Sequence, residues 1–150
     1  MEIIRLSKND AWWGKALLYM ESCSWVAVGK HLAEMMKHNK FSDWESVFIA
    51  VEKDSIIGFC TFLKTDYSPE NRYSPWISSI FVDEKARGNR VSEKMIKAAE
   101  AYAKKQGFSK VYIPSDMEGF YEKYGFIPID ALENYSGDFD TILMKDLCLS

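Results

Sequence analysis

The sequence is poor in the residues that mark fibrous, disordered or disulfide-stapled proteins. Only 4 of its 150 residues are proline and 8 are glycine, which excludes collagen-like and low-complexity chains. Its three cysteines, Cys23, Cys60 and Cys148, are odd in number and form no CxxC pair, so a reducing compartment fits better than a disulfide scaffold. The longest apolar runs, such as residues 47–51, are too short to cross a bilayer, and the first residues lack the basic-then-apolar order of a signal peptide. We therefore expect a cytoplasmic protein with no membrane partner.

The chain also lacks an excess of positive charge. Its 19 Lys and Arg residues against 22 Asp and Glu residues give a net charge of −3, so binding to nucleic acid through a general positive field is not expected. Two histidines, His31 and His38, would lie about 10.5 Å apart along one helix, and we expect no metal site. Hydrophobic residues make up 47% and charged residues 27%, as in ordinary globular proteins. With no linker or repeat in view, we expect a single domain over residues 1–150, as a monomer or a homodimer.

Hydrophobic periodicity divides the chain into short strands and amphipathic helices. Strands are expected at 2–6, 46–51, 56–64, 76–82, 111–114, 126–129 and 138–145, helices at 11–21, 26–38, 89–106 and 117–124, and a polar loop at 65–75. The strand-helix-strand run from 76 to 114 predicts two parallel strands joined by a right-handed crossover, and the flanking hairpins favour antiparallel neighbours. We therefore expect an α/β (α+β) fold with a central mixed sheet and helices on both of its faces.

A cationic segment lies where the strand at 76–82 gives way to the helix at 89–106. Its basic residues are Lys85, Arg87, Arg90 and Lys94. Because a helix N-terminus already carries partial positive charge, cations there are unfavourable unless an anion docks on them. The alternative is a solvated basic surface that nearby acids partly neutralise; these acids are Asp83, Glu84 and Glu93. Neither GxGxxG nor GxxxxGK[ST] is present, so the two common nucleotide-binding loops are excluded.

Two motifs around this strand-helix-strand unit resemble a known family. Residues 87–92, Arg-Gly-Asn-Arg-Val-Ser, resemble the acyl-CoA pyrophosphate loop of the Gcn5-related N-acetyltransferases (GNAT), and residues 120–126, Phe-Tyr-Glu-Lys-Tyr-Gly-Phe, resemble the family's Phe-Tyr-x-x-x-Gly-Phe segment. Arg90 stands where the family has its central loop glycine, and Ser92 where it has glycine or alanine. From this we expect ordinary helical backbone angles at Arg90, with a side chain that swings clear of the phosphates or joins their contacts.

The resemblance implies an acetyl-CoA-dependent N-acetyltransferase with a GNAT-like fold. It implies coenzyme A as the carrier of the acetyl group, and direct attack by a primary amine of a small-molecule or peptide acceptor. Backbone N–H groups near Phe81 and Val82 would bind the oxyanion. Ser115 and Asp116 are candidates for cofactor or water contacts, or for the N-cap of the short helix that follows. The cofactor-binding residues that we predict are Ile80, Phe81, Val82, Arg87, Gly88, Asn89, Arg90, Val91, Ser92, Ser115 and Asp116.

The resemblance also implies that Tyr121 acts as the general acid. A phenol with a pKa near 10 stays protonated at neutral pH and can donate its proton to the leaving thiolate. The alternative is that Tyr121 only packs in an aromatic cluster, the role that we assign to Tyr124. The strand at 76–82 has no carboxylate to serve as base, so deprotonation through a water held by Ser78, Ser79 or a backbone carbonyl is expected. Two other functions stay open: an acyltransferase that uses another acyl-CoA, and a non-catalytic acyl-CoA sensor.

Overall fold

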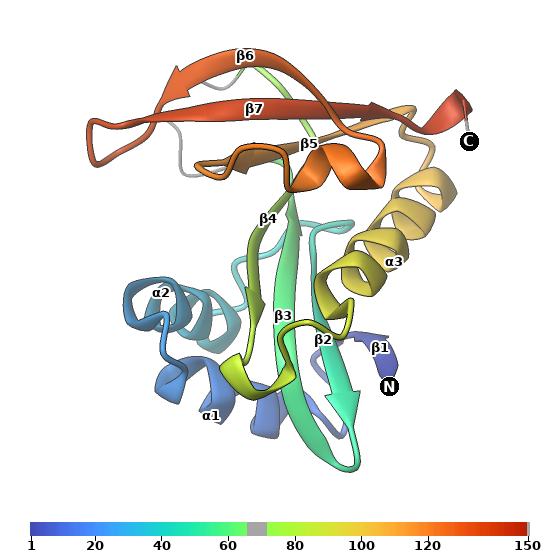
Figure 1. The fold of residues 1–150 in the computed structure, drawn as a ribbon. Coiled ribbons are helices and arrows are strands. Elements are labelled where there is room, and N and C mark those ends of the chain that lie inside the picture. The colour runs from blue at the N-terminus through green and yellow to red at the C-terminus, as the bar shows by residue number, and fades with distance from the viewer. Residues whose placement is uncertain (66–71, 150) are drawn as a thin grey trace. The chain divides into compact units, whose positions relative to one another are not determined.

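The computed structural model describes residues 1–65 and 72–149 (Figure 1). Its strands are β1 (Glu2–Arg5), β2 (Ser46–Glu52), β3 (Ser55–Leu63), β4 (Trp76–Val82), β5 (Lys110–Ser115), β6 (Ile127–Glu133) and β7 (Phe139–Asp146). Its helices are α1 (Trp13–Ser22), α2 (Val26–Lys37) and α3 (Val91–Lys105), with short 3-10 helices η1 (Glu84–Ala86), η2 (Tyr121–Tyr124) and η3 (Leu147–Leu149). Most of the loop expected at 65–75 lies outside the described residues.

The described strands form one mixed sheet in the order β1-β2-β3-β4-β5-β7-β6. Strand β4 pairs with β5 in parallel at Trp76 and Tyr112, whereas β1 and β2, β5 and β7, and β6 and β7 pair antiparallel. The parallel pair flanks α3 in the chain, as the strand-helix-strand pattern predicts. The mixed sheet expected from the sequence is therefore confirmed.

The chain forms two compact units. The first consists of Met1–Thr61 and Ser79–Ala98, and the second of Phe62–Ser78 and Ala99–Ser150. Strands β3 and β4 and helix α3 each contribute residues to both units. That residues 1–150 act as a single domain stays a prediction.

In the first unit, helices cover both faces of the strands. Figure 1 shows α1 and α2 on one side of β2 and β3 and the first half of α3 on the other. Strand β2 is buried at six successive positions, residues 46–51, as expected for a strand that is covered on both faces. Its odd-numbered residues join a core that also contains Met20, Leu32, Met36 and Phe59. Because β2 has no polar face, its sequence shows a continuous apolar run instead of alternation.

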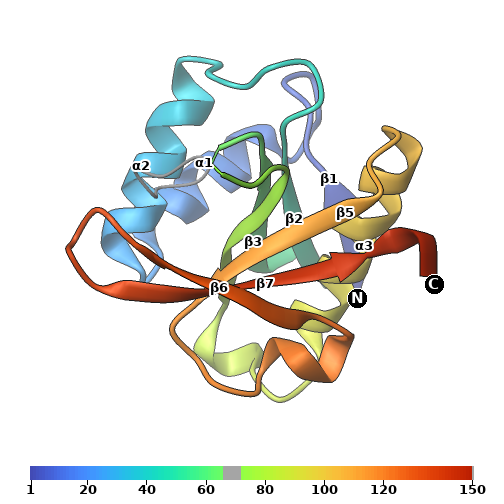
Figure 2. The same cartoon turned by 90° about the horizontal axis from the view of Figure 1, so that it is seen from above.

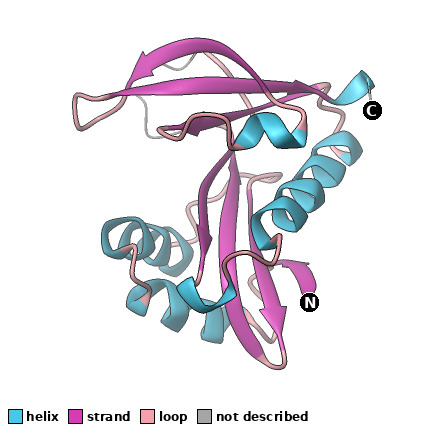
Figure 3. Ribbon diagram, in the orientation of Figure 1, coloured by secondary structure: helices cyan, strands magenta, loops and turns pink. Residues whose placement is uncertain are grey.

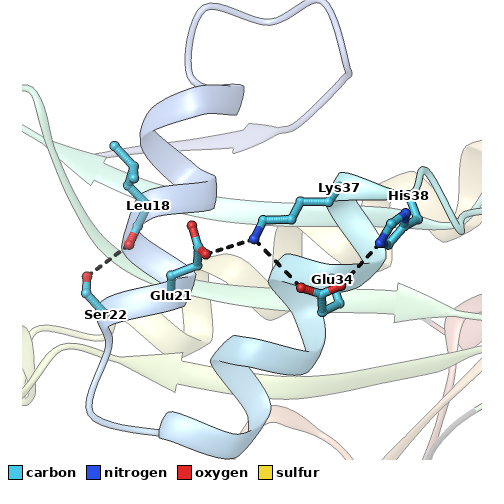
Figure 4. A network of polar contacts seen from close by, with 6 residues as sticks. All are labelled: Leu18, Glu21, Ser22, Glu34, Lys37 and His38. Atoms are coloured by element: carbon cyan, nitrogen blue, oxygen red, sulfur yellow. Dashed lines mark hydrogen bonds and ion pairs between the residues drawn. The ribbon is translucent and has the colours of Figure 1, made fainter.

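Polar contacts join α1 to α2 at their surface (Figure 4). The Lys37 amine lies 3.0 Å from a Glu21 carboxylate oxygen and 3.7 Å from one of Glu34, and the His38 ring nitrogen lies 3.2 Å from the other oxygen of Glu34. Hydrogen bonding to Glu21 raises the pKa of Lys37. These exposed pairs add little to stability. Within the described residues, no cluster of three or more His, Cys, Asp or Glu is placed to hold a metal ion, and no helix is long and apolar enough to span a membrane.

In the second unit, β5, β7 and β6 lie side by side (Figure 2). Strand β6 ends the strand order and contains Pro128 next to a register shift, which suits an edge strand because proline cannot donate a ladder hydrogen bond. The sequence predicts this strand only over 126–129, so its observed length to Glu133 is a correction. Trp76, Leu132 and Ile142 form a cluster of buried hydrophobic residues here.

The short helix expected at 117–124 is largely wrong. Only Tyr121–Tyr124 is helical, as a single 3-10 turn between β5 and β6 (Figure 3). Two local features stop the helix from starting earlier. The Ser115 hydroxyl accepts a hydrogen bond from the Met117 N–H at 2.9 Å, closing a tight turn, and Gly119 has a φ of +74°, which an α-helix cannot contain. The expected stop at Gly125 is confirmed, since its φ is +93°, as is common after a helix end.

Candidate acyl-CoA site

The end of β4 is held firmly against β3 in the first unit. The Asp83 N–H donates to the Ile57 carbonyl at 2.8 Å, and Phe81 stacks on Phe59 with ring centroids 5.2 Å apart. A Cβ on Gly58 would lie 2.7 Å from the Phe81 carbonyl oxygen, so only glycine allows this approach of the two strands. The predicted cofactor-binding strand residues, Ile80 to Val82, therefore have a rigid support, with Phe81 buried and its two neighbours half-buried.

The two acids that follow β4 point their carboxylates at α1 and at the turn after it. One Asp83 oxygen accepts a hydrogen bond from the Tyr19 hydroxyl at 3.3 Å, and the other caps the Lys85 N–H at 3.2 Å. A Glu84 oxygen accepts a hydrogen bond from the Ser24 hydroxyl at 2.6 Å. Burial, and next the Asp83 charge, raise the pKa of Tyr19. Asp83 and Glu84 thus have hydrogen-bond partners on and after α1, which the alternative of a solvated, partly neutralised basic surface does not include.

Side-chain hydrogen bonds to the backbone shape the loop itself. The Arg87 Nε donates to the Val82 carbonyl at 3.1 Å, so the guanidinium folds back over the end of β4. The Asn89 amide donates to the Ala86 carbonyl at 3.1 Å. Gly88, between them, has a φ of +86°, which favours glycine. The loop is therefore set by its own residues before any ligand binds.

Arg90 does not have the ordinary helical angles expected for it. Its φ is +59°, in the left-handed region, where a residue with a Cβ costs about 1–2 kcal/mol. The turn into α3 therefore keeps a conformation that suits glycine, although an arginine occupies the position. The Arg90 side chain is 81% exposed and lies 3.8 Å from a Glu93 oxygen, so it swings out toward solvent.

Helix α3 begins directly after Arg90, whose carbonyl accepts the Lys94 N–H at 3.2 Å. The N–H groups of the three residues before Lys94 have no carbonyl within the helix to pair with. With the helix dipole, they form a favourable place for an anion. Val91 is buried and anchors the start, Ser92 is half-buried, and the basic side chains around it are exposed. The structure thus brings residues 80–82 and 87–92 into one continuous strand-loop-helix segment.

The remaining predicted site residues lie in the second unit. Tyr121 begins η2, is 5% exposed, and packs edge-on against Phe120 with ring centroids 5.0 Å apart. Ser115 is buried at the end of β5, where it closes the turn with Met117 instead of capping a helix. Asp116 is exposed in the bend that follows.

Comparison with known proteins identifies the family. A model of the acetyltransferase (GNAT) family matches residues 14–126. The chain belongs to this family. The match includes the strand-loop-helix segment and ends at the last residue of the Phe-Tyr-x-x-x-Gly-Phe motif. The prediction of an enzyme of the GNAT type is confirmed. A search of curated proteins gave no match.

Solved structures confirm the GNAT fold. An aminoglycoside 6'-N-acetyltransferase complexed with coenzyme A matches with a TM-score of 0.74 and 16% identity, covering 98% of this chain and 97% of that one. The aminoglycoside 6'-N-acetyltransferase of Enterococcus faecium matches at 0.75 and 15%, with the same coverage. A GNAT acetyltransferase of Elizabethkingia anophelis with acetyl-CoA bound matches at 0.65 and 16%, covering 97% of each chain.

Sequence reasoning missed the contacts that support the GNAT loop from a distance. Tyr19 and Asp83 are 64 residues apart in the chain, and Ser24 and Glu84 are 60 apart. No local pattern links such pairs. The sequence offers one signal, the tyrosine at position 19 in α1, because a partly buried tyrosine hydroxyl usually finds a hydrogen-bond partner.

Proposed function

We propose that this GNAT protein transfers the acetyl group of acetyl-CoA to a primary amine. The observation that carries the proposal is the loop before α3, where two left-handed residues, Gly88 and Arg90, precede the unpaired N–H groups of a 15-residue helix. The carboxylates after β4 accept hydrogen bonds from Tyr19 and Ser24, and the basic side chains of the loop are exposed, where an anion can reach them. A diphosphate is the anion that such a loop suits.

In this proposal the backbone N–H groups of residues 88–92 bind the CoA pyrophosphate. Arg87 contributes its terminal guanidinium nitrogens, since its Nε already donates to Val82. Arg90 is exposed and adds a positive charge at the surface of the loop. The backbone of Ile80 to Val82 runs along the pantetheine arm, and Ser115 and Asp116 make further cofactor or water contacts.

The proposed chemistry is direct acyl transfer. The neutral amine attacks the thioester carbonyl carbon, a C–N bond forms, and the C–S bond breaks. Backbone N–H groups near Phe81 and Val82 stabilise the oxyanion. Tyr121 donates its phenolic proton to the departing thiolate, and the amine loses a proton to a water held by Ser78, Ser79 or a backbone carbonyl.

The acceptor that we propose to test first is a small molecule with several amines. Two of the structures that share this fold carry the name aminoglycoside 6'-N-acetyltransferase, which makes aminoglycosides the first compounds to try. Polyamines, amino acids and peptide N-termini complete the panel. Because the identity to those structures is at most 16%, the fold alone does not select among these classes.

The test measures acetyl-CoA binding first and acetyl transfer second. Acetyl-CoA is expected to raise the melting temperature, because a ligand that binds only the native state stabilises it. Thiol release from acetyl-CoA is then measured with each amine. Release above background with at least one amine supports the transferase. Tight CoA binding without release for any amine would point to the sensor, and an unchanged melting temperature at millimolar acetyl-CoA would refute the cofactor assignment.

A further inference from the structure

A partly buried lysine on β7 contacts the turn that carries Tyr121. The Lys145 amine donates to the Tyr124 carbonyl at 2.9 Å, and its side chain is only 19% exposed. Tyr124 is the last residue of η2, so its carbonyl is one of those that a helix end leaves unpaired. A cation at that end also complements the dipole of the turn. All of these residues belong to the second unit.

A carboxylate on α3 holds this lysine in place. One Glu100 oxygen lies 2.9 Å from the Lys145 amine, with the Glu100 side chain 12% exposed. The other Glu100 oxygen is buried and has no hydrogen-bond partner among the described residues. Desolvating both charges is costly, and an apolar pair of similar shape often stabilises a protein as well or better. Stability alone therefore gives little reason for this pair.

Gly125 leaves room for the same contact. A Cβ at this position would lie 3.2 Å from the Lys145 Cε, tighter than ordinary van der Waals contact. The φ of +93° adds a second reason for glycine. The glycine of the Phe-Tyr-x-x-x-Gly-Phe motif thus both ends the turn and admits the lysine stem, while the amine lies 5.8 Å from the centre of the Phe126 ring.

The turn itself is too short to fix Tyr121 alone. A four-residue 3-10 helix has few hydrogen bonds and poorer geometry than an α-helix. Here the Gly125 N–H bonds the Glu122 carbonyl at 3.1 Å, and the Phe126 N–H bonds the Tyr121 carbonyl at 3.4 Å. A bond from β7 to the last carbonyl adds an anchor from outside the turn, and α3 fixes that anchor through Glu100.

We propose that Lys145 is a positioning residue for Tyr121, and that Glu100 sets the position of Lys145. This inference rests on the proposed role of Tyr121 as general acid. Neither Lys145 nor Glu100 takes part in the chemistry. Their effect on the rate passes through the placement of the Tyr121 phenol.

The experiment is a double-mutant cycle in the full chain. The variant K145M/E100Q removes both charges, so no unpaired ion stays buried, and methionine keeps an apolar stem beside Gly125. It is compared with wild type, with Y121F, and with the triple variant, on an amine that the wild type accepts. Lys123→Met is the matched control, because Lys123 lies on the same turn but contacts the Phe120 ring instead of a backbone carbonyl.

K145M/E100Q is expected to lower kcat about 10- to 100-fold, the scale of a small displacement of a reacting group, with KM for acetyl-CoA within about twofold. In the Y121F background the same pair should lower kcat less than about twofold, because its effect passes through the missing phenol. K123M should match wild type. If K145M/E100Q does not fold, K145Q/E100Q goes through the same cycle, because it also leaves no unpaired charge buried, and its amide can still donate to the Tyr124 carbonyl, so the expected loss is smaller.

Equal losses in both backgrounds would overturn the inference while leaving the proposed acid intact, since Lys145 would then act independently of Tyr121. An unchanged kcat in K145M/E100Q would overturn it as well. If Y121F itself retains wild-type kcat, the acid assignment of the proposed function fails, and this inference fails with it.

Discussion

Replacing Arg90 with glycine separates the backbone strain of the loop from its charge. Arg90 has a φ of +59°, which costs about 1–2 kcal/mol for a residue with a Cβ. Glycine removes that cost, but the greater conformational freedom of its backbone in the unfolded chain lowers the stability by about 0.5–1 kcal/mol relative to alanine. The exposed contact with Glu93 contributes little. Arg90→Gly should therefore stabilise the free protein by about 0.5–1 kcal/mol, a rise of about 1–4 °C in Tm for a chain of this size.

Arg90→Ala is the control, because alanine also has a Cβ and keeps the strain. Its Tm should stay close to that of the wild type. Both variants lack the guanidinium, so both should bind CoA more weakly, at the lower end of about 1–3 kcal/mol for a charge-assisted hydrogen bond because the side chain is exposed. Added salt should reduce the difference from wild type, since it screens exposed charge.

Two assays decide the outcome. Thermal unfolding without ligand compares the Tm of the variants and so reports the backbone strain at residue 90. Calorimetric titration with CoA at two salt concentrations measures how much the Arg90 charge contributes to CoA affinity. If Arg90→Gly is no more stable than Arg90→Ala, the backbone at this position is not strained. If both variants bind CoA as tightly as wild type, Arg90 makes no phosphate contact.

Three further outcomes are expected. Tyr121→Phe should lower kcat about 10²-fold, which is the low end for loss of a general acid because CoA thiolate is a fair leaving group. The control Tyr124→Phe should leave kcat nearly unchanged. If Tyr121→Phe retains more than half of the wild-type kcat where chemistry limits the rate, Tyr121 is a packing residue. Arg87→Ala should weaken CoA binding by about 1–3 kcal/mol. It should weaken the binding of a pantetheine thioester that lacks the phosphates by less. Equal losses of affinity for the two ligands would mean that Arg87 only supports the fold. Burial raises the pKa of Tyr19 above its ordinary value, so above about pH 10 the unfolded chain loses a proton that the folded chain keeps. The Tm of wild type should therefore be constant relative to that of Tyr19→Phe below about pH 9 and should fall relative to it as the pH rises above about 10. A constant difference across both ranges would contradict the shift.

The elements predicted best are those with a strong local pattern at both ends. Strand β4 has the predicted bounds of residues 76–82, because a mostly apolar segment follows a proline and ends at a charged loop. Helix α3 carries a clear apolar stripe, and Gly107 follows it with a φ of +91°, as expected for a glycine after a helix C-terminus. Such signals lie within a few residues of the boundary that they mark.

Predictions failed where one residue's backbone angle overrode the surrounding pattern. At 117–124 the sequence predicts a helix, but Gly119 has a left-handed conformation and excludes one. At Arg90 the residue type favours helical angles, and the loop around it imposes the opposite sign of φ. In both cases the backbone φ of one residue depends on how the neighbouring segment must turn. The intrinsic conformational preference of that residue gives no information about this turn.

The charge of the proposed site could not be obtained by counting residues in the loop. The sequence places three acids among four cations in residues 83–94, so the cations look partly neutralised. In the structure, Asp83 and Glu84 accept hydrogen bonds from Tyr19 and Ser24, whereas a Glu93 oxygen lies 3.8 Å from the Arg90 guanidinium. A carboxylate held by a hydroxyl donor has a fixed orientation, and its field is directed by that geometry. Because the donors come from α1 and from the turn after it, the orientation of both carboxylates depends on how α1 packs, and residue counts along the loop contain no information about that packing.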